Sequence, residues 1–185
     1  MLIDRMIRAA RLDVNLYEEV EADTTLTSQA ATVVVIVAIC AGVSHAISVM
    51  MGREGNVATA IGALIGGVIA ALIGWVVWSY LTYWIGTSMF AGTATPGEML
   101  RTIGFAHTPG VLQIAGFIPC LGGLALLVAG IWSLIAGVIA IRQALDFDTG
   151  KAIITALIGW IVMMIITIGV AVVFGVGAAL SGALR

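Results

Sequence analysis

Few side chains in this sequence could serve as a base, a nucleophile or a metal ligand. The histidines are His45 and His107, and the cysteines are Cys40 and Cys120. They stand in separate segments without the spacing of zinc-binding or disulfide-linked residues. Acid–base or nucleophilic chemistry needs partner groups within about 3 Å of each other. The sequence therefore predicts a protein that is not an enzyme and that binds no metal or cofactor.

The composition is that of a membrane protein. Apolar side chains make up 61% of the 185 residues and charged ones 10%, and the mean hydropathy is +1.15. Soluble domains carry about 25% charged residues, so this chain is far too apolar to be one of them. The net charge is −2, and its few basic residues form no stripe, which excludes nucleic-acid binding. The lipid bilayer is the predicted environment.

Five apolar segments are long enough to be membrane spans, at about 29–51, 57–85, 98–118, 121–141 and 152–180. About 20 helical residues cover the 30 Å hydrocarbon core. The third segment contains Pro109 and ends at Pro119, so we expect a kinked span; a re-entrant pair shielded by protein is the alternative. The predicted fold is all-α: a polytopic membrane bundle of five transmembrane helices over residues 28–185.

Residues 1–27 are predicted to form an amphipathic helix in the membrane interface, on the cytoplasmic side. Apolar residues recur there every three or four positions, which places them on one helix face. The arginines of this segment would contact anionic lipid headgroups. Its acidic residues, 18–23, would face water or a partner. The apolar face consists of Ile3, Met6, Ile7, Ala10, Val14, Tyr17 and Val20.

Small residues recur at regular intervals in three of the segments. Spacings of four or seven residues keep them on one helix face, where another helix backbone can approach closely. We therefore predict helix-packing faces in the second, fourth and fifth segments. Their members are Gly62, Gly66, Ala70 and Gly74, then Gly116, Gly123, Gly130 and Gly137, and finally Ala171, Gly175 and Ala179.

Five further side chains are candidate contacts for a partner or for lipid. His45 lies within an apolar span, where an ionisable residue suggests function; a neutral imidazole bonded to a neighbouring helix is the alternative. Trp78 and Trp84 belong to an aromatic group typical of the lipid headgroup level, although a quinone or pigment site would use the same rings. Arg101 and His107 are expected at the cytoplasmic edge of the third segment.

The positive residues predict the orientation. With five spans, one side of the membrane receives six basic residues and the other receives Arg53 and Arg185. By the positive-inside rule the N-terminus is cytoplasmic and the C-terminus is outside the cell membrane. A four-span arrangement, with 98–118 on the surface, would weaken this bias. The six residues are Arg5, Arg8, Arg11, Arg101, Arg142 and Lys151.

The stretch Leu100-Arg101-Thr102-Ile103-Gly104-Phe105-Ala106-His107-Thr108-Pro109 resembles the Gly-aromatic-x-x-x-Pro signature of the YIP-domain family of Ypt-interacting membrane proteins. The acidic lead-in at 16–23 and the five apolar segments are similar to the prokaryotic branch of that family. The resemblance implies a five-span bundle with a cytoplasmic N-terminus. Eukaryotic relatives bind small GTPases, but their Asp-Leu-Tyr-Gly-Pro motif is missing here, so the resemblance does not carry GTPase binding over.

Two hypotheses about function follow. The first is a non-enzymatic scaffold or accessory subunit that packs against other integral membrane proteins through its small-residue faces. The alternative is a small transporter or channel that uses the broken third segment and His45. No inverted repeat is detectable, which favours the first hypothesis.

Overall fold

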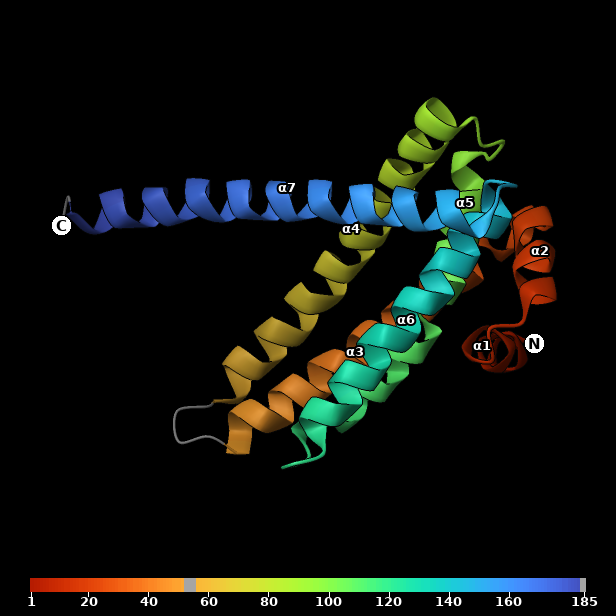
Figure 1. The fold of residues 1–185 in the computed structure, drawn as a ribbon. Coiled ribbons are helices and arrows are strands. Elements are labelled where there is room, and N and C mark those ends of the chain that lie inside the picture. The colour runs from red at the N-terminus through yellow and green to blue at the C-terminus, as the bar shows by residue number, and fades with distance from the viewer. Residues whose placement is uncertain (52–55, 184–185) are drawn as a thin grey trace.

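The computed structural model describes residues 1–51 and 56–183, and these residues are helical with no strand among them. The predicted all-α class is therefore confirmed. Figure 1 shows the long helices α3, α4 and α6 running between two ends of the molecule, the long helix α7 lying across them, and the short helices α1, α2 and α5 gathered at one end. In chain order they are α1 (Leu2–Ala10), α2 (Val14–Ala22), η1 (Thr24–Leu26), α3 (Thr27–Met51), α4 (Val57–Phe90), α5 (Pro96–Ala106), η2 (Thr108–Phe117), α6 (Gly122–Ala144) and α7 (Thr149–Ala183).

Four helices in the described ranges are long and apolar enough to cross a membrane. They are α3, α4, α6 and α7, and they match the first, second, fourth and fifth predicted spans. The third predicted span differs, because residues 98–118 form α5 followed by the 3-10 helix η2 instead of one kinked helix. The chain is a multi-pass membrane protein, and the fifth crossing stays a prediction.

Local sequence explains where α5 begins and ends. A capping box begins the helix: the Glu98 N–H donates to the Thr95 hydroxyl at 3.3 Å, and the Thr95 N–H donates to the Glu98 carboxylate at 2.7 Å. Pro109 has no N–H to continue the helix and disfavours the helical conformation of the residue before it. Cys120, with φ 66°, then turns the chain toward α6.

The broken segment α5–η2 runs parallel to α3 in close contact. Three of its glycines lie so near that an added Cβ atom would come within 2.7–2.8 Å of an α3 atom. Successive contacts advance by six residues on α5–η2 and by seven on α3, so the contact extends over about 21 Å of α3. The pairs are Gly104 with Ala30, Gly110 with Val37, and Gly116 with Ser44.

The N-terminal segment forms two helices and not the single helix that its periodicity suggested. Leu12 adopts a left-handed φ of 61° between α1 and α2. Asp13 then caps α2, because its carboxylate accepts a hydrogen bond from the Asn15 N–H at 3.0 Å. A capping aspartate preceded by left-handed backbone ends one helix and begins the next.

Ion pairs hold α1 against α2. Glu19 accepts hydrogen bonds from Arg5 Nε at 2.8 Å and from Arg8 Nη1 at 2.6 Å. Arg8 also binds the Asp13 carboxylate at 2.8 Å. Two of the arginines expected at lipid headgroups are therefore paired within the protein, whereas Arg11 is exposed.

The centre of the fold is α5, which packs against α2, α3, α4 and α6. Met99, Ile103 and Phe105 are almost completely buried there. The Trp75 indole of α4 donates to the Leu100 carbonyl at 3.0 Å, so this ring packs inside the protein and is not part of an aromatic belt. Within a bilayer such side chains stabilise the fold mainly by close van der Waals packing, because lipid tails are as apolar as they are.

The α4–α5 and α6–α7 loops meet at the end where α2 and α5 lie (Figure 1). Thr93 bonds to the Leu145 carbonyl at 3.2 Å and to the Asp146 carboxylate at 2.8 Å, which joins the α4–α5 loop to the α6–α7 loop. From this end α7 crosses α4 and α6 and extends away from the bundle. Arg53 and Arg185, the two basic residues predicted on the other side of the membrane, lie outside the described residues.

Candidate functional site

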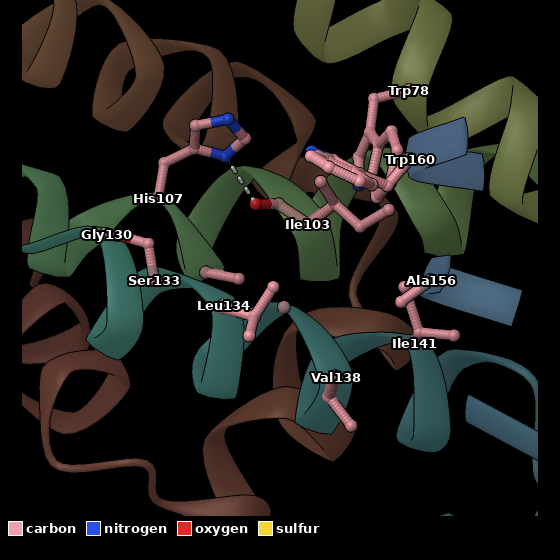
Figure 2. Close-up of a pocket in the computed structure, with 12 residues that line it drawn as sticks. Trp78, Ile103, His107, Gly130, Ser133, Leu134, Val138, Ile141, Ala156 and Trp160 are labelled. Carbon is pink, nitrogen blue, oxygen red and sulfur yellow. Dashed lines mark hydrogen bonds between the residues drawn. The ribbon is translucent and has the colours of Figure 1, made fainter. Parts of the chain in front are cut away.

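A cavity of about 330 Å³ lies where α4, α5, α6 and α7 meet, and we call it the Trp cavity. It brings together four of the predicted site residues, Trp78, His107, Gly130 and Gly137, with side chains that the sequence did not single out. Figure 2 shows the two indole rings on one side and His107 on the other. The remaining lining residues are Ile103, Ala106, Ser133, Leu134, Val138, Ile141, Ala156 and Trp160.

His107 is held in one orientation by its own helix. Its Nδ1 lies 2.8 Å from the Ile103 carbonyl oxygen (Figure 2). A carbonyl oxygen only accepts, so Nδ1 carries the proton, and in the neutral imidazole Nε2 is then an acceptor. The contact with Ile103 therefore fixes the ring and leaves Nε2 as a hydrogen-bond acceptor.

Four of the five tryptophans of this protein form two pairs that differ in their hydrogen bonding. Trp75 and Trp132 donate their indole N–H to the backbone carbonyls of Leu100 and Ala10, at 3.0 and 2.7 Å. Trp78 and Trp160 have no such bond within the described residues, and Trp160 is 60% exposed. Two amphipathic rings with unused N–H groups thus form a wall of the Trp cavity.

A second cavity of about 380 Å³, the His cavity, lies between α3, α4 and η2. His45, His107 and Gln113 all line it, so the structure brings the two histidines to one space. A smaller cavity continues from it and is lined by His45, Gln113, Ser44 and Ser48. Cys40 and Cys120 line neither of them. In the described part of the chain no three His, Cys, Asp or Glu side chains are placed to hold a metal ion.

Arg101 lines neither the Trp cavity nor the His cavity. It is 4% exposed, and its guanidinium donates to the carbonyls of Val20, at 2.8 Å, and Glu21 at the end of α2. The carboxyl of Glu21 is half-buried beside other acidic groups. Burial, followed by Asp146 and other nearby carboxylates, raises the pKa of Glu21 to about 7, although Arg101 opposes this shift. Arg101 therefore has a structural partner in its own chain.

The predicted small-residue faces divide into inward and outward positions. Gly116 packs against Ser44 and Leu126. At the other glycines of the predicted faces in the second and fourth segments an added Cβ would meet nothing within 4 Å, and Ala70 is exposed. The surroundings of Ala171, Gly175 and Ala179 are outside what the structure describes. The open positions are Gly62, Gly66, Gly74, Gly123, Gly130 and Gly137.

The sequence did not single out Ser133, Gln113 or Trp160 as site residues. A polar residue within an apolar span is a weak signal for function, and Gln113 carried that signal in the run 110–118. Ser133 and Trp160 carried none, because their role depends on which helices are neighbours. Trp84 is 64% exposed on α4, away from both cavities.

Comparison with known proteins identifies one family. The Yip1 domain family matches residues 15–171 of this chain. No curated protein and no solved structure matches it. The matched range contains both cavities and the signature stretch from Gly104 to Pro109, in which Gly104 contacts α3 and Phe105 is buried in the core.

Proposed function

Because the chain belongs to the Yip1 domain family, a family of membrane proteins not known as enzymes, we propose that it is a membrane scaffold or accessory subunit. It would pack against other integral membrane proteins in the cell membrane. We place it in the prokaryotic branch of the family, without a role in binding small GTPases. Its partners are then recognised by helix packing within the bilayer.

One observation carries this proposal: the outer face of α4 has a row of glycines, and within the described residues no other helix packs against them. Gly62, Gly66 and Gly74 leave space in which a Cβ would meet nothing within 4 Å. Glycine loses more entropy on folding than other residues and weakens a helix by about 1 kcal/mol, so a row of glycines needs a packing reason. Close approach of a second helix supplies that reason.

We also propose that α5–η2 is the third of five membrane crossings. Its parallel contact with α3 supports this, since α3 itself runs from the end that holds α1 and α2 to the opposite end (Figure 1). A broken span requires that protein shield its irregular backbone from lipid, and Thr108, Pro109 and Gly110 at the start of η2 are buried. With five crossings the two termini lie on opposite sides of the membrane, and the bias of the basic residues then favours a cytoplasmic N-terminus and a C-terminus outside.

Co-purification tests the scaffold role. The full chain, tagged at its N-terminus, is extracted in digitonin and its stoichiometric partners are identified by mass spectrometry. We expect an integral membrane partner that is lost in Gly66→Leu, which fills the outer face, and retained in Ile65→Leu, which conserves volume on the same helix. Recovery of the wild-type chain as a free monomer would count against the proposal.

A second candidate function is transport, which is favoured by the position of His107 between two cavities. His107 borders both the Trp cavity and the His cavity, and His45 and Gln113 extend the polar lining toward Ser44. Polar side chains at membrane depth are what a proton or ion path needs. In proteoliposomes this reading predicts proton or ion flux that disappears with His45→Ala. If vesicles that contain the wild-type protein show no more flux than empty vesicles, transport is excluded.

A further inference from the structure

The first helix of the chain lies across the direction of the membrane spans. Figure 1 shows α1 end-on, whereas α3 and α6 are seen from the side. Two contacts hold α1 on the flank of the bundle. The Arg5 guanidinium donates to the side-chain oxygen of Gln29 in α3 at 3.2 Å, and the Trp132 indole of α6 donates to the Ala10 carbonyl at 2.7 Å.

The neighbours of α1 also define its depth along the first span. Gln29 stands near the start of α3, at the polar end of that span. On the other side of α1 a crevice of about 430 Å³ is lined by Ile3, Ile7 and, from α3, Ile36. Ile36 follows Gln29 by two helical turns, which is about 10 Å along the span, and a helix with its side chains is about 10 Å wide. α1 therefore lies beside the outermost layer of the first span.

The charged and the apolar side chains of α1 point in different directions. Arg5 and Arg8 both bind the Glu19 carboxylate, so α2 covers the charged side. The apolar residues Ile3 and Ile7 remain 71% and 48% exposed. They line the crevice whose other wall reaches the depth of Ile36. The exposed apolar side of α1 thus faces the interior of the bilayer, and its paired charges face α2.

This exposed side continues the lipid-facing surface of the bundle. Leu112 of η2 and Trp132 of α6 line the same crevice, and Leu112 is 39% exposed. Both α3 and α6 are apolar enough to cross a membrane, so lipid that covers this flank also meets Ile3 and Ile7. We propose that α1 is an in-plane membrane anchor, with its apolar side among the acyl chains of the leaflet at this end of the bundle and with α2 above it in water.

The anchor is hydrophobic and needs no anionic lipid. Arg5 and Arg8 direct their charges to Glu19 and Asp13, so they do not hold lipid phosphates. Of the three arginines in this segment, Arg11 is the exposed one. One cation at a membrane surface contributes less to binding than the burial of two isoleucine side chains. Insertion should therefore be the same in neutral and in anionic membranes.

Spin labels in proteoliposomes test the position of α1. A nitroxide is attached to Ile3→Cys, Ile7→Cys or Asp4→Cys in a full chain whose two native cysteines are replaced by serine. Power saturation compares its collisions with oxygen, which concentrates in the bilayer, and with a water-soluble nickel chelate. Ile39→Cys, exposed within the first span, provides the reference for lipid.

We expect the oxygen-to-nickel ratio at Ile3→Cys and Ile7→Cys to approach that at Ile39→Cys. It should exceed the ratio at Asp4→Cys about threefold or more, because Asp4 is exposed on the charged side of the same helix. Equal ratios at Ile3→Cys and Asp4→Cys would show that α1 stands in water and would overturn the proposal. No partner protein is needed, so the result is independent of the scaffold role.

Lipid composition separates a hydrophobic anchor from an electrostatic one. The ratios should be unchanged between phosphatidylcholine vesicles and vesicles that also contain phosphatidylglycerol, and they should resist high salt. If the labels at Ile3→Cys and Ile7→Cys enter the bilayer only with phosphatidylglycerol, arginine contacts hold the helix and the hydrophobic anchor is wrong.

An added charge tests the anchor without a label on the mutated residue. Ile7→Asp places a carboxylate among acyl chains, where a charge is costly, and should lower the ratio at Ile3→Cys about threefold. Asn15→Asp is the matched control, because it adds the same charge at an exposed position of α2 and should leave the ratio unchanged. Size-exclusion chromatography checks folding, and Ile7→Gln replaces Ile7→Asp if that variant aggregates. An unchanged ratio in the folded Ile7 variant would contradict the anchor.

Discussion

Arg101 Nε donates a hydrogen bond to the carbonyl oxygen of Val20 at 2.8 Å, and the same guanidinium donates to the carbonyl of Glu21. Both oxygens belong to the last turn of α2, where carbonyls have no partner within their own helix. A buried cation there also interacts favourably with the negative end of the helix dipole. Arg101, far away in sequence, thus caps α2 and fixes the N-terminal helices on the bundle.

Replacing Arg101 should release α2. Arg101→Met keeps much of the side-chain volume but removes both charge-assisted bonds and leaves two carbonyls unpaired, at a cost of about 2–4 kcal/mol. Hydrogen–deuterium exchange of the intact protein in detergent should show faster exchange over residues 14–22, with little change in α6.

Arg142→Met provides the matched control for this prediction. Arg142 is half-buried at the same end of the molecule, and among the described residues its side chain bonds to those of Gln143 and Thr149 but to no carbonyl of α2. Its loss should leave exchange in α2 unchanged. Equal protection of α2 in wild type and Arg101→Met would contradict the capping role.

The stability of this region should depend on pH through Glu21. Burial and neighbouring carboxylates raise its pKa from 4.5 to about 7, so the folded protein binds this proton more tightly than the unfolded chain. Stability should therefore fall as the pH rises from about 4.5 to 7 and level off above that. Because the group is partly exposed, we expect an effect of about 1 kcal/mol after allowing for solvent screening.

Glu21→Gln removes this dependence. Thermal unfolding followed by tryptophan fluorescence should give a higher midpoint for the variant than for wild type at pH 8, and equal midpoints near pH 4. Asp4→Asn removes an exposed carboxylate from α1 and controls for the change in net charge. Parallel pH profiles of wild type and Glu21→Gln would refute the buried-carboxyl interpretation.

Glycines that look alike in the sequence should respond oppositely to alanine. At Gly104 a Cβ would lie 2.7 Å from the Ala30 Cβ and 3.2 Å from its backbone, which cannot move aside easily. Gly104→Ala should destabilise the protein by about 1–3 kcal/mol through overpacking. Gly62→Ala, at an open position, should be neutral or slightly stabilising because alanine favours the helix. Thermal midpoints in detergent measure both, and equal midpoints would contradict the packing assignment.

The contrast between these glycines shows what sequence reasoning can and cannot supply. Capping at Thr95 and the break at Pro109 were predictable, because both depend on neighbours within four residues. Regular spacing of glycines shows that they share a face, but it does not say whether that face meets α3, a partner or lipid. The contact of Gly104 with Ala30 joins segments far apart in the chain, and only the fold specifies it.

The same limit applies to the candidate site. His107 was singled out for its expected place at the cytoplasmic edge of the third segment, which follows from the sequence alone. Its tautomer depends on the Ile103 carbonyl one turn earlier, and its cavity depends on Ser133 and Trp160 from two other helices. Ser133 and Trp160 resemble ordinary residues of membrane helices until α6 and α7 are placed beside α5.

Cys120 reports on the number of membrane crossings. It is exposed in the turn between η2 and α6, whereas Cys40 is half-buried within α3. If α5–η2 crosses the membrane and the N-terminus is cytoplasmic, the turn lies outside the cell. A membrane-impermeant maleimide should then label the protein in intact spheroplasts, and the label should vanish in Cys120→Ser and persist in Cys40→Ser. If 98–118 instead lies on the cytoplasmic surface, Cys120 reacts only after the membrane is permeabilised, and the chain has four crossings.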